Sequence, residues 1–505
     1  MSSRAAAGAS VARAEGTVAG ANAGLRDGST GAVGSEGADA GVRAIAEHIA
    51  RGAEPDRSGR VGLELEHFIV RAQDDSSIPY RDDPLTGALG LSGILEALAP
   101  FYDEQVFEPQ ADGSKQLIGL ARRCSTLTLE PGAQLEISIS PLRRIADVQA
   151  VYQAFRRELD PLLDSLGYQT RELGYRPTAC ARDIPLIPKE RYRLMDAHFS
   201  TTGQHGLCMM RATAATQVSI DYRDERDAVR KFRLANALSP LFAFITDNSP
   251  IFEGMPIGSG VRTPSGLALP KRMVRMAVWD DVDAQRSGTA PHTFDEDFGF
   301  DAYARAILGA QAIFTTEDDG AGGRQNVSQG ARSFAEALAG REPDLREIEH
   351  ILSLFFFDAR FKTYVEIRAA DSLPPDYAFA FAALVKGLFY DDGILDELAA
   401  ELASVDAKDI AEAKAALRAR AWEALVYGRP VTEWLDGLIE RALCTLDEDD
   451  RRYLEPLAQL VAERRTLVDS LVDRQAGATT EDEVAGGLGA LRERYLACFE
   501  REGGD

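Results

Sequence analysis

The segment Leu127-Thr128-Leu129-Glu130-Pro131-Gly132-Ala133-Gln134-Leu135-Glu136-Ile137-Ser138 alternates apolar and polar side chains on either side of a Pro-Gly pair. Successive side chains of a β-strand point to opposite faces, so Leu135 and Ile137 share an apolar face and Glu136 lies on the other one. Proline followed by glycine is typical of a turn. The segment therefore predicts β-structure with one apolar and one polar face, interrupted by a turn just after Glu130.

The same alternation occurs at residues 61–70, 215–222 and 363–368. Between these segments lie stretches in which apolar residues recur at helical spacing, such as 144–166 and 226–247. The strands do not follow a regular βαβ rhythm, and from about residue 375 the pattern is almost wholly helical. Together these patterns predict an α+β fold in which helices surround a mainly antiparallel sheet.

Five glutamates lie on the polar faces of these strands or at their turn. They are Glu64, Glu66, Glu130, Glu136 and Glu366. Glutamate is depleted in strands, and no lysine is expected among these five to relieve the repulsion between like charges. Oxygen ligands without histidine or cysteine suit Mg²⁺ or Mn²⁺. The alternative is the solvent-facing side of an antiparallel sheet, which carries polar residues without any function.

Four arginines are candidate ligands for anionic substrates: Arg211, Arg275, Arg286 and Arg368. Arginine matches carboxylates and phosphates with two parallel donors and keeps its charge. For most of them a surface ion pair is the simpler interpretation. Arg368 differs because it lies two residues after Glu366, on the same face of the strand, where we expect it to be partly buried with a partner.

The charge balance of the 505-residue chain restricts its partners. The chain has 80 acidic and 56 basic residues and a net charge of -24 at pH 7, and such a field repels nucleic acid and anionic lipid. No run of about 18 apolar residues occurs, which predicts no membrane span. The five cysteines are scattered, which favours free thiols over a zinc site or disulfides. We expect a cytoplasmic protein with small-molecule partners, and the sequence leaves the oligomeric state open.

Residues 1–38 are rich in Ala, Gly and Ser and nearly lack large apolar side chains. Such a segment cannot bury enough surface to offset its ordering entropy, so we predict a disordered leader. A helix is expected to begin near Asp39. Residues 39–505 are predicted to form one catalytic domain, whose C-terminal part from about residue 375 is helical.

Two motifs carry a family resemblance. Gly62-Leu63-Glu64-Leu65-Glu66 and the opening segment 127–138 closely resemble glutamate–cysteine ligases of the plant and proteobacterial type. The family has glycine where Ala133 stands. Further matches follow in the same order at residues 209–221, 230–250, 275–288 and 364–371. The resemblance covers about residues 45–400.

The resemblance implies a glutamine-synthetase-like fold whose antiparallel sheet carries the metal ions and ATP. It also implies the reaction. ATP phosphorylates the γ-carboxylate of glutamate, and the amino group of cysteine then displaces phosphate, which gives γ-glutamylcysteine for glutathione or a related thiol. Metal ions and arginines would neutralise the charge of the transferred group.

The resemblance also assigns roles to the matching positions. The implied metal ligands are Glu64, Glu66, Glu130, Glu136 and Glu366. Glu366 and Arg368 are the implied catalytic pair, and Arg368 would stabilise the phosphoryl group in transfer. Arg211, Arg275 and Arg286 are the candidates for holding substrate carboxylates or nucleotide phosphates.

Three alternatives remain open. The same mechanism could use a different amine, because a fold does not fix the substrate. A small-molecule phosphotransferase of related fold would release ADP but form no amide. A non-catalytic binding protein derived from a ligase is the third possibility, and the presence of all five glutamates with Arg368 argues against it.

Overall fold

The computed structural model describes residues 35–55, 59–110, 112–258, 262–318 and 324–469. Among them, nine strands form one sheet in the order β14-β15-β7-β1-β5-β4-β3-β2, with β6 pairing to β1. Every pair in this sheet is antiparallel. The strands are β1 (Val61–Arg71), β2 (Glu104–Pro109), β3 (Lys115–Arg122), β4 (Ser125–Leu129), β5 (Leu135–Leu142), β6 (Tyr168–Arg171), β7 (Ala215–Ile220), β14 (Ala359–Phe361) and β15 (Val365–Asp371).

Four further pairs of short strands lie outside the main sheet. They are β8 (Ile251–Phe252) with β9 (Met255–Pro256), β10 (Ser287–Gly288) with β13 (Phe356–Phe357), β11 (Phe314–Asp318) with β12 (Arg324–Ser328), and β16 (Leu425–Val426) with β17 (Arg429–Pro430). Only the pair of β10 and β13 is parallel among the strand pairs of the described ranges.

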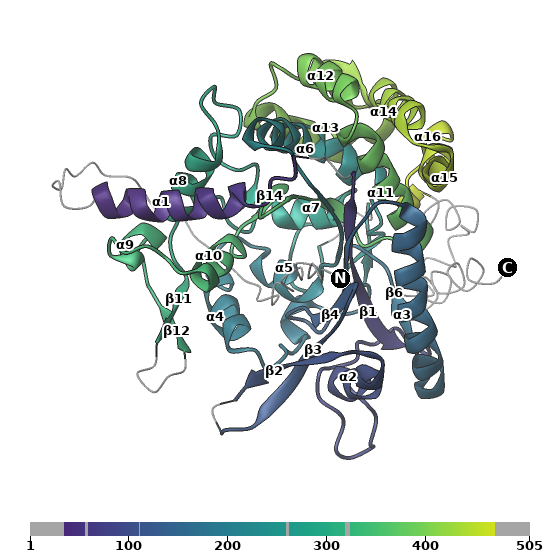
Figure 1. Ribbon diagram of the computed structural model, residues 1–505. Helices are drawn as coiled ribbons and strands as arrows, with labels where there is room; N and C mark the ends of the chain where they lie inside the picture. Colours follow the sequence, from purple (N-terminus) through teal and green to yellow (C-terminus); the bar gives the residue numbers. More distant parts are fainter. Residues whose placement is uncertain (1–34, 56–58, 111, 259–261, 319–323, 470–505) are drawn as a thin grey trace, which may run out of the picture.

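Helices surround the sheet, and the last six gather at one end of the molecule (Figure 1). They are α1 (Ser35–Ala50), α2 (Leu91–Leu98), α3 (Ile145–Leu166), α4 (Glu190–Phe199), α5 (Gly206–Ala212), α6 (Glu225–Ile245), α7 (Val274–Trp279), α8 (Phe300–Gly309), α9 (Phe334–Leu338), α10 (Leu345–Leu352), α11 (Pro375–Phe389), α12 (Asp392–Glu401), α13 (Ala407–Arg420), α14 (Val431–Thr445), α15 (Glu448–Arg451) and α16 (Glu455–Ala462). This arrangement confirms the predicted α+β fold with an antiparallel sheet and a helical C-terminal region. In the described part of the chain no helix is long and apolar enough to cross a bilayer.

The apolar face of the sheet packs against helices. Leu63, Leu65 and Ile137 are at most 1% exposed, and His67 on the same face of β1 contacts α3, where its Nε2 lies 3.0 Å from the hydroxyl of Tyr152. Helices α6 and α11 also pack against the central strands. Because residues i and i+2 of a strand share a face, burying this side leaves the polar residues of the predicted strands on the other side.

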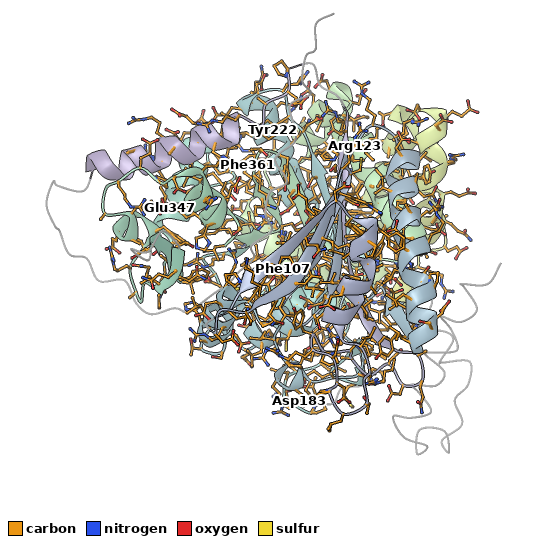
Figure 2. All side chains as sticks on the ribbon, turned by 60° about the horizontal axis from the view of Figure 1, so that its bottom comes forward. Phe107, Arg123, Asp183, Tyr222, Glu347 and Phe361 are labelled. Carbon is orange, nitrogen blue, oxygen red and sulfur yellow. The ribbon has the colours of Figure 1, made fainter. Side chains whose placement is uncertain are left out.

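An aromatic cluster supports the end of the sheet formed by β14 and β15. Phe361 stacks on Phe232 with ring centroids 4.1 Å apart and packs edge-on against Phe300 and Tyr303. Tyr222 and Phe361, both labelled in Figure 2, pack against Phe300 with ring centroids 5.9 and 5.4 Å away, whereas Phe107 lies on the edge strand β2. The hairpin that carries Glu366 is therefore built on a rigid base.

The turn between β4 and β5 explains the motif that opens the sequence analysis. The amide of Ala133 donates to the carbonyl of Glu130 at 2.9 Å, and Ala133 itself has φ of +62°, in the left-handed region. At Gly132 a Cβ atom would lie 2.2 Å from the carbonyl oxygen of Arg211, so only glycine permits this close approach to α5. The turn thus fixes Glu130 at the edge of the polar face.

Replacing Ala133 by glycine is expected to be nearly neutral, although Ala133 is buried. Glycine loses the methyl contacts and adds entropy to the unfolded chain, but it relieves the left-handed conformation, which costs an alanine about 1–2 kcal/mol. Ala121→Gly is the matched control, because Ala121 is equally buried in an extended strand and gains no such relief. Denaturant unfolding should show Ala121→Gly to be the more destabilising by about 1–2 kcal/mol. Equal losses would contradict the strain at Ala133.

The N-terminal prediction needs one correction. Helix α1 begins at Ser35 rather than near Asp39, so residues 35–38 do not belong to a disordered leader. Residues 1–34 lie outside the described residues, and the leader prediction for them stays a prediction. Helix α1 packs on α8, with Gly41 facing Leu308, and its first turn lies upstream of its buried residues Val42 and Ile45.

Candidate active site

The predicted glutamates lie on one face of the central strands. Glu66 of β1 stands directly opposite Glu136 of β5. Glu64 lies between Ser138 of β5 and Gln217 of β7 in the register of the sheet. Glu366 of β15 pairs with Ser219 of β7 on the other side. The sheet therefore brings together carboxylates that are about 300 residues apart in the sequence.

Four of these glutamates form an acidic half of the face: Glu64, Glu66, Glu130 and Glu136. Burial, and after it the charges of neighbouring glutamates, raises the pKa of Glu64 to about 7 and that of Glu66 well above its usual range. Burial is also the main cause that raises the pKa values of Glu130 and Glu136. Burial and mutual repulsion both disfavour the charged form of these carboxylates, and a bound cation would offset both effects.

Glu366 has the opposite environment. Its Oε2 accepts from Arg360 Nε at 2.7 Å and from Arg368 Nη1 at 2.8 Å, and its Oε1 accepts from Arg360 Nη2 at 3.0 Å. Lys362 Nζ lies 3.2 Å from the same Oε1. Burial would raise the pKa of Glu366, but these three cations outweigh it and hold the pKa well below its ordinary value. The expectation that no lysine lies among the glutamates is therefore wrong.

Gln217 links the two halves. Its Nε2 donates to Glu66 Oε1 at 3.1 Å, and its Oε1 accepts a hydrogen bond from Arg368 Nη1. Glu66 also accepts from the backbone amide of Ala215 at 2.9 Å. A continuous chain of hydrogen bonds thus runs from the acidic half to the cations around Glu366, and it fixes the position of Arg368 between them.

The donor set fits a hard divalent cation, although the side chains do not converge as ligands. In the part of the chain that the structure describes, no three acidic, histidine or cysteine side chains are placed to hold a metal ion. Glu66 is bound to β7, and Glu136 accepts from Thr128 Oγ1 at 2.8 Å and Ser138 Oγ at 3.0 Å. Carboxylates without histidine or thiolate are nevertheless the chemistry that Mg²⁺ prefers. Metal binding here requires rotation of these side chains.

Only one of the three other predicted arginines comes near this face. Arg275 is buried, donates from Nη1 to the carbonyl of Arg368 at 3.1 Å and interacts with Glu66. Arg211 is bound to Asp196 at 2.5 Å, beside the turn after β4. Arg286 is fully buried and pairs with Asp283 at 3.0 Å, which gives it a structural contact away from the glutamates. The binding roles of these arginines stay predictions.

Two further cations, Lys189 and Arg191, lie near Glu130, and Arg191 is held in place by His350. Arg191 Nη1 donates to His350 Nδ1 at 3.0 Å, and His350 Nε2 donates to the carbonyl of Phe314 at 3.2 Å. This pattern requires neutral imidazole with its proton on Nε2. Burial, followed by the charge of Arg191, lowers the pKa of His350 from 6.5 to about 3.

The His350 contact predicts a pH dependence of stability. Between about pH 3 and 6.5 the unfolded chain binds a proton at His350 that the folded protein does not, so the free energy of unfolding falls as the pH falls through this window. Wild type and His350→Gln share every other titrating group, so we expect wild type to lose more stability than the variant between pH 7 and pH 5. Urea unfolding at both pH values measures this difference. Parallel losses would show that His350 is protonated in the folded protein.

Sequence reasoning missed Arg360, Lys362 and Gln217. The hairpin contains a signal for the first two. Arg360 and Glu366 are six residues apart and face each other in its register, and Lys362 is two residues from Arg360 on the same face. Gln217 lies in the predicted strand segment 215–222, but its role depends on Arg368 and Glu66 from two other strands.

The fold and this charged face define an α+β protein whose antiparallel sheet carries a candidate active site on one face. A model of glutamate-cysteine ligase family 2 (GCS2) matches residues 60–491. The chain belongs to this family, which confirms the resemblance found in the sequence.

Individual relatives agree with the family model. Glutamate–cysteine ligase B, chloroplastic, of Oryza sativa subsp. japonica is 30% identical over 359 residues, which cover 70% of this chain and 66% of the relative. The chloroplastic glutamate–cysteine ligase of Arabidopsis thaliana is 30% identical over 358 residues, 70% of this chain and 63% of the relative. The matches thus span slightly less than two thirds of these relatives. A Francisella tularensis glutamate–cysteine ligase, solved in complex with AMP, aligns over 87% of this chain and 88% of its own, with 11% identity and a TM-score of 0.47.

Proposed function

We propose that this protein is a glutamate–cysteine ligase that uses ATP and Mg²⁺ to join the γ-carboxylate of L-glutamate to the amino group of L-cysteine. The observation that carries the proposal is the polar face, where the glutamates of the two family motifs lie opposite one another and Gln217 links Glu66 to Arg368. The family membership of the chain and the names of its relatives support the same activity.

The chemistry matches the residues. The terminal phosphoryl group of ATP is transferred to the glutamate γ-carboxylate, and the P–O bond to ADP breaks. The cysteine amine then attacks the acyl carbon, loses a proton and expels phosphate. Glu64, Glu66, Glu130 and Glu136 would hold Mg²⁺, which supplies charge neutralisation when bound. Arg368 is positioned by Gln217 and Glu366 to bind the phosphoryl oxygens, and no protein nucleophile is needed.

Glu366 takes part in a different way from the other four glutamates. Each of its oxygens already accepts from two cationic donors, which leaves little capacity for a metal ion. We propose that Glu366 positions the cations around it. Its assignment as a metal ligand stays a prediction that the Glu366→Gln variant below addresses.

The test is a reaction of the full chain with glutamate, cysteine, ATP and Mg²⁺. Mass spectrometry should detect γ-glutamylcysteine, with ADP and free phosphate released in equal amounts. If ADP is released but an amide forms only with an amine other than cysteine, the acceptor substrate is that amine and not cysteine. A phosphorylated small molecule without free phosphate would replace the ligase by a phosphotransferase. No turnover with any amine of a panel would leave only a binding role.

Metal dependence and location are parts of the proposal. Activity should disappear with excess EDTA and return with Mg²⁺ or Mn²⁺. A cytoplasmic location is proposed because Cys124, Cys180, Cys208 and Cys444 are all free thiols in the structure. Fractionation of the source cells would test this location.

A further inference from the structure

The hairpin of β14 and β15 carries a row of polar side chains on one face. Arg360 and Glu366 pair across it, and Lys362, Tyr364 and Arg368 are each two residues from one of them. Arg360, Glu366 and Arg368 share one face of the hairpin. Lys362 and Tyr364 lie in its turn; Lys362 Nζ lies 3.2 Å from Glu366 Oε1 and 5.4 Å from the ring of Tyr364, so both side chains are on the same side. Lys362 also interacts electrostatically with Glu64 of that half.

The charges of this row do not cancel. Glu366 contributes -1, and Arg360, Lys362 and Arg368 contribute +3, so the group has a net charge of +2. Arg360 is buried and donates its hydrogen bonds to Glu366 and to the carbonyl of Phe355. The positive charge that reaches the face comes from the other two cations. Their side chains are 28% exposed in Lys362 and 11% in Arg368.

Lys362 keeps hydrogen-bonding capacity for a ligand. An ammonium group has three donors; the contact with Glu366 Oε1 at 3.2 Å uses one, and a hydrogen bond with the hydroxyl of Tyr364 takes a second, which leaves the third for a ligand. The ring of Tyr364 lies 5.4 Å from Nζ and restricts the side chain from one side. Lys362 is partly exposed and lies beside Glu366, whose charge is already neutralised by other cations. Its ammonium group is therefore suited to binding an anion.

The backbone at Lys362 is fixed. Lys362 N donates to the carbonyl of Tyr364 at 2.9 Å, and the hydroxyl of Tyr222 lies 3.4 Å from the Lys362 carbonyl. At Gly52, after α1, a Cβ atom would lie 2.0 Å from the carbonyl of Thr363, so glycine alone allows α1 to close on the tip of the hairpin. Such pre-organisation lowers the entropy lost when Lys362 binds a ligand.

We propose that Lys362 binds phosphate oxygens of the nucleotide and forms, with Arg368, a cationic clamp beside the metal-binding glutamates. This inference rests on the proposed use of ATP. The face then has two complementary parts. The acidic half takes the divalent cation, and the clamp takes the negative oxygens that the cation leaves uncovered. Arg368 serves the phosphoryl group in transfer, and Lys362 serves binding of the phosphate chain.

The test compares Lys362→Gln and Lys362→Arg with wild type. A hydrogen bond between charged groups predicts a rise of about tenfold or more in the KM for ATP and in the Kd for MgADP with Lys362→Gln. The KM for glutamate should stay within about twofold of wild type, and Lys362→Arg should recover most of the lost affinity. Lys408→Gln is the matched control, because Lys408 is 79% exposed in an ion pair on α13 and should leave all constants unchanged.

A purely structural role gives a different result. If Lys362 only neutralises Glu366, Lys362→Gln lowers the melting temperature and leaves the KM for ATP and the Kd for MgADP at wild-type values, which would overturn the clamp. If Lys362→Gln does not fold, chemical modification of the wild-type protein still tests the proposal. MgADP should slow acetylation of Lys362 by acetic anhydride at least threefold and leave Lys408 unaffected, as measured by mass spectrometry. Equal rates with and without MgADP would also overturn the proposal.

Failure of this inference is distinct from failure of the proposed function. If wild type makes γ-glutamylcysteine and Lys362→Gln has an unchanged KM for ATP, only the clamp is wrong. If wild type forms no amide and binds no MgADP, the proposed function itself is wrong.

Discussion

Replacing Arg368 by lysine is expected to lower kcat by roughly 100-fold or more while the KM for ATP changes little. Under the proposed function, the metal ion and Lys362 would already neutralise the nucleotide in the ground state, so one more cation would add little to binding. As the phosphoryl group moves to the glutamate carboxylate, charge redistributes over its oxygens and a fixed donor gains strength. The interaction therefore belongs mainly to the transition state.

The contacts of Arg368 explain why lysine cannot replace it. One guanidinium nitrogen, Nη1, bonds to both Gln217 and Glu366 and fixes the plane of the group. A lysine keeps the charge but has neither the second nitrogen nor the planar geometry. Steady-state kinetics and the melting temperature should be measured on the same preparation. Arg464→Lys, at an exposed pair with Asp436, is the control for the substitution itself. A loss of stability with intact turnover would give Arg368 a structural role only.

Replacing Glu136 by glutamine is expected to abolish activity and to leave the melting temperature unchanged or higher. Glu136 lies opposite Glu66, and its pKa is raised by burial and by Glu130, so removing its charge relieves repulsion in the metal-free protein. Glu366→Gln should also abolish activity, but it should lower the melting temperature. It leaves Arg360, Lys362 and Arg368 without their shared carboxylate.

The two glutamine variants separate the two kinds of glutamate. Glu136→Gln should weaken the dependence of stability on Mg²⁺, which thermal unfolding with and without the ion measures. Glu412→Gln, at an exposed ion pair of α13, serves as the control. Near-wild-type turnover of Glu136→Gln at saturating Mg²⁺ would remove Glu136 from the metal ligands. A raised melting temperature in Glu366→Gln would mean that the three cations do not depend on its charge.

The sequence predicted the strands and their faces well because alternation is a local property. The predicted segments 61–70 and 215–222 correspond to β1 and β7, and the face that carries Glu64 and Glu66 was assigned correctly. The turn after Glu130 was also predicted, because Pro131 restricts φ and Gly132 allows a close contact.

The contacts within the site could not be predicted in the same way, because they depend on which strands become neighbours. Alternation places Glu366 on a polar face but does not show that Arg360 neutralises it across a hairpin. Arg368 could be singled out because it follows Glu366 on the same strand face, but no local pattern shows that Arg286 is buried beside Asp283 instead. Residue type predicts what a side chain can bind, but the order of the strands in the sheet determines which residues become its neighbours.

The strand order also has a consequence for synthesis of the protein. Strand β1 leaves the ribosome early, and it pairs with β5 on one side and β7 on the other. The second edge of β7 forms its hydrogen bonds only with β15, where Ile220 pairs with Val365. Until residue 371 has emerged, a nascent chain exposes the unpaired edge of β7 inside its future sheet, and an unpaired edge is a hazard for aggregation. Pairings of such long sequence separation also form slowly. Catalytic competence should therefore appear late and all at once, after the β14–β15 hairpin has docked.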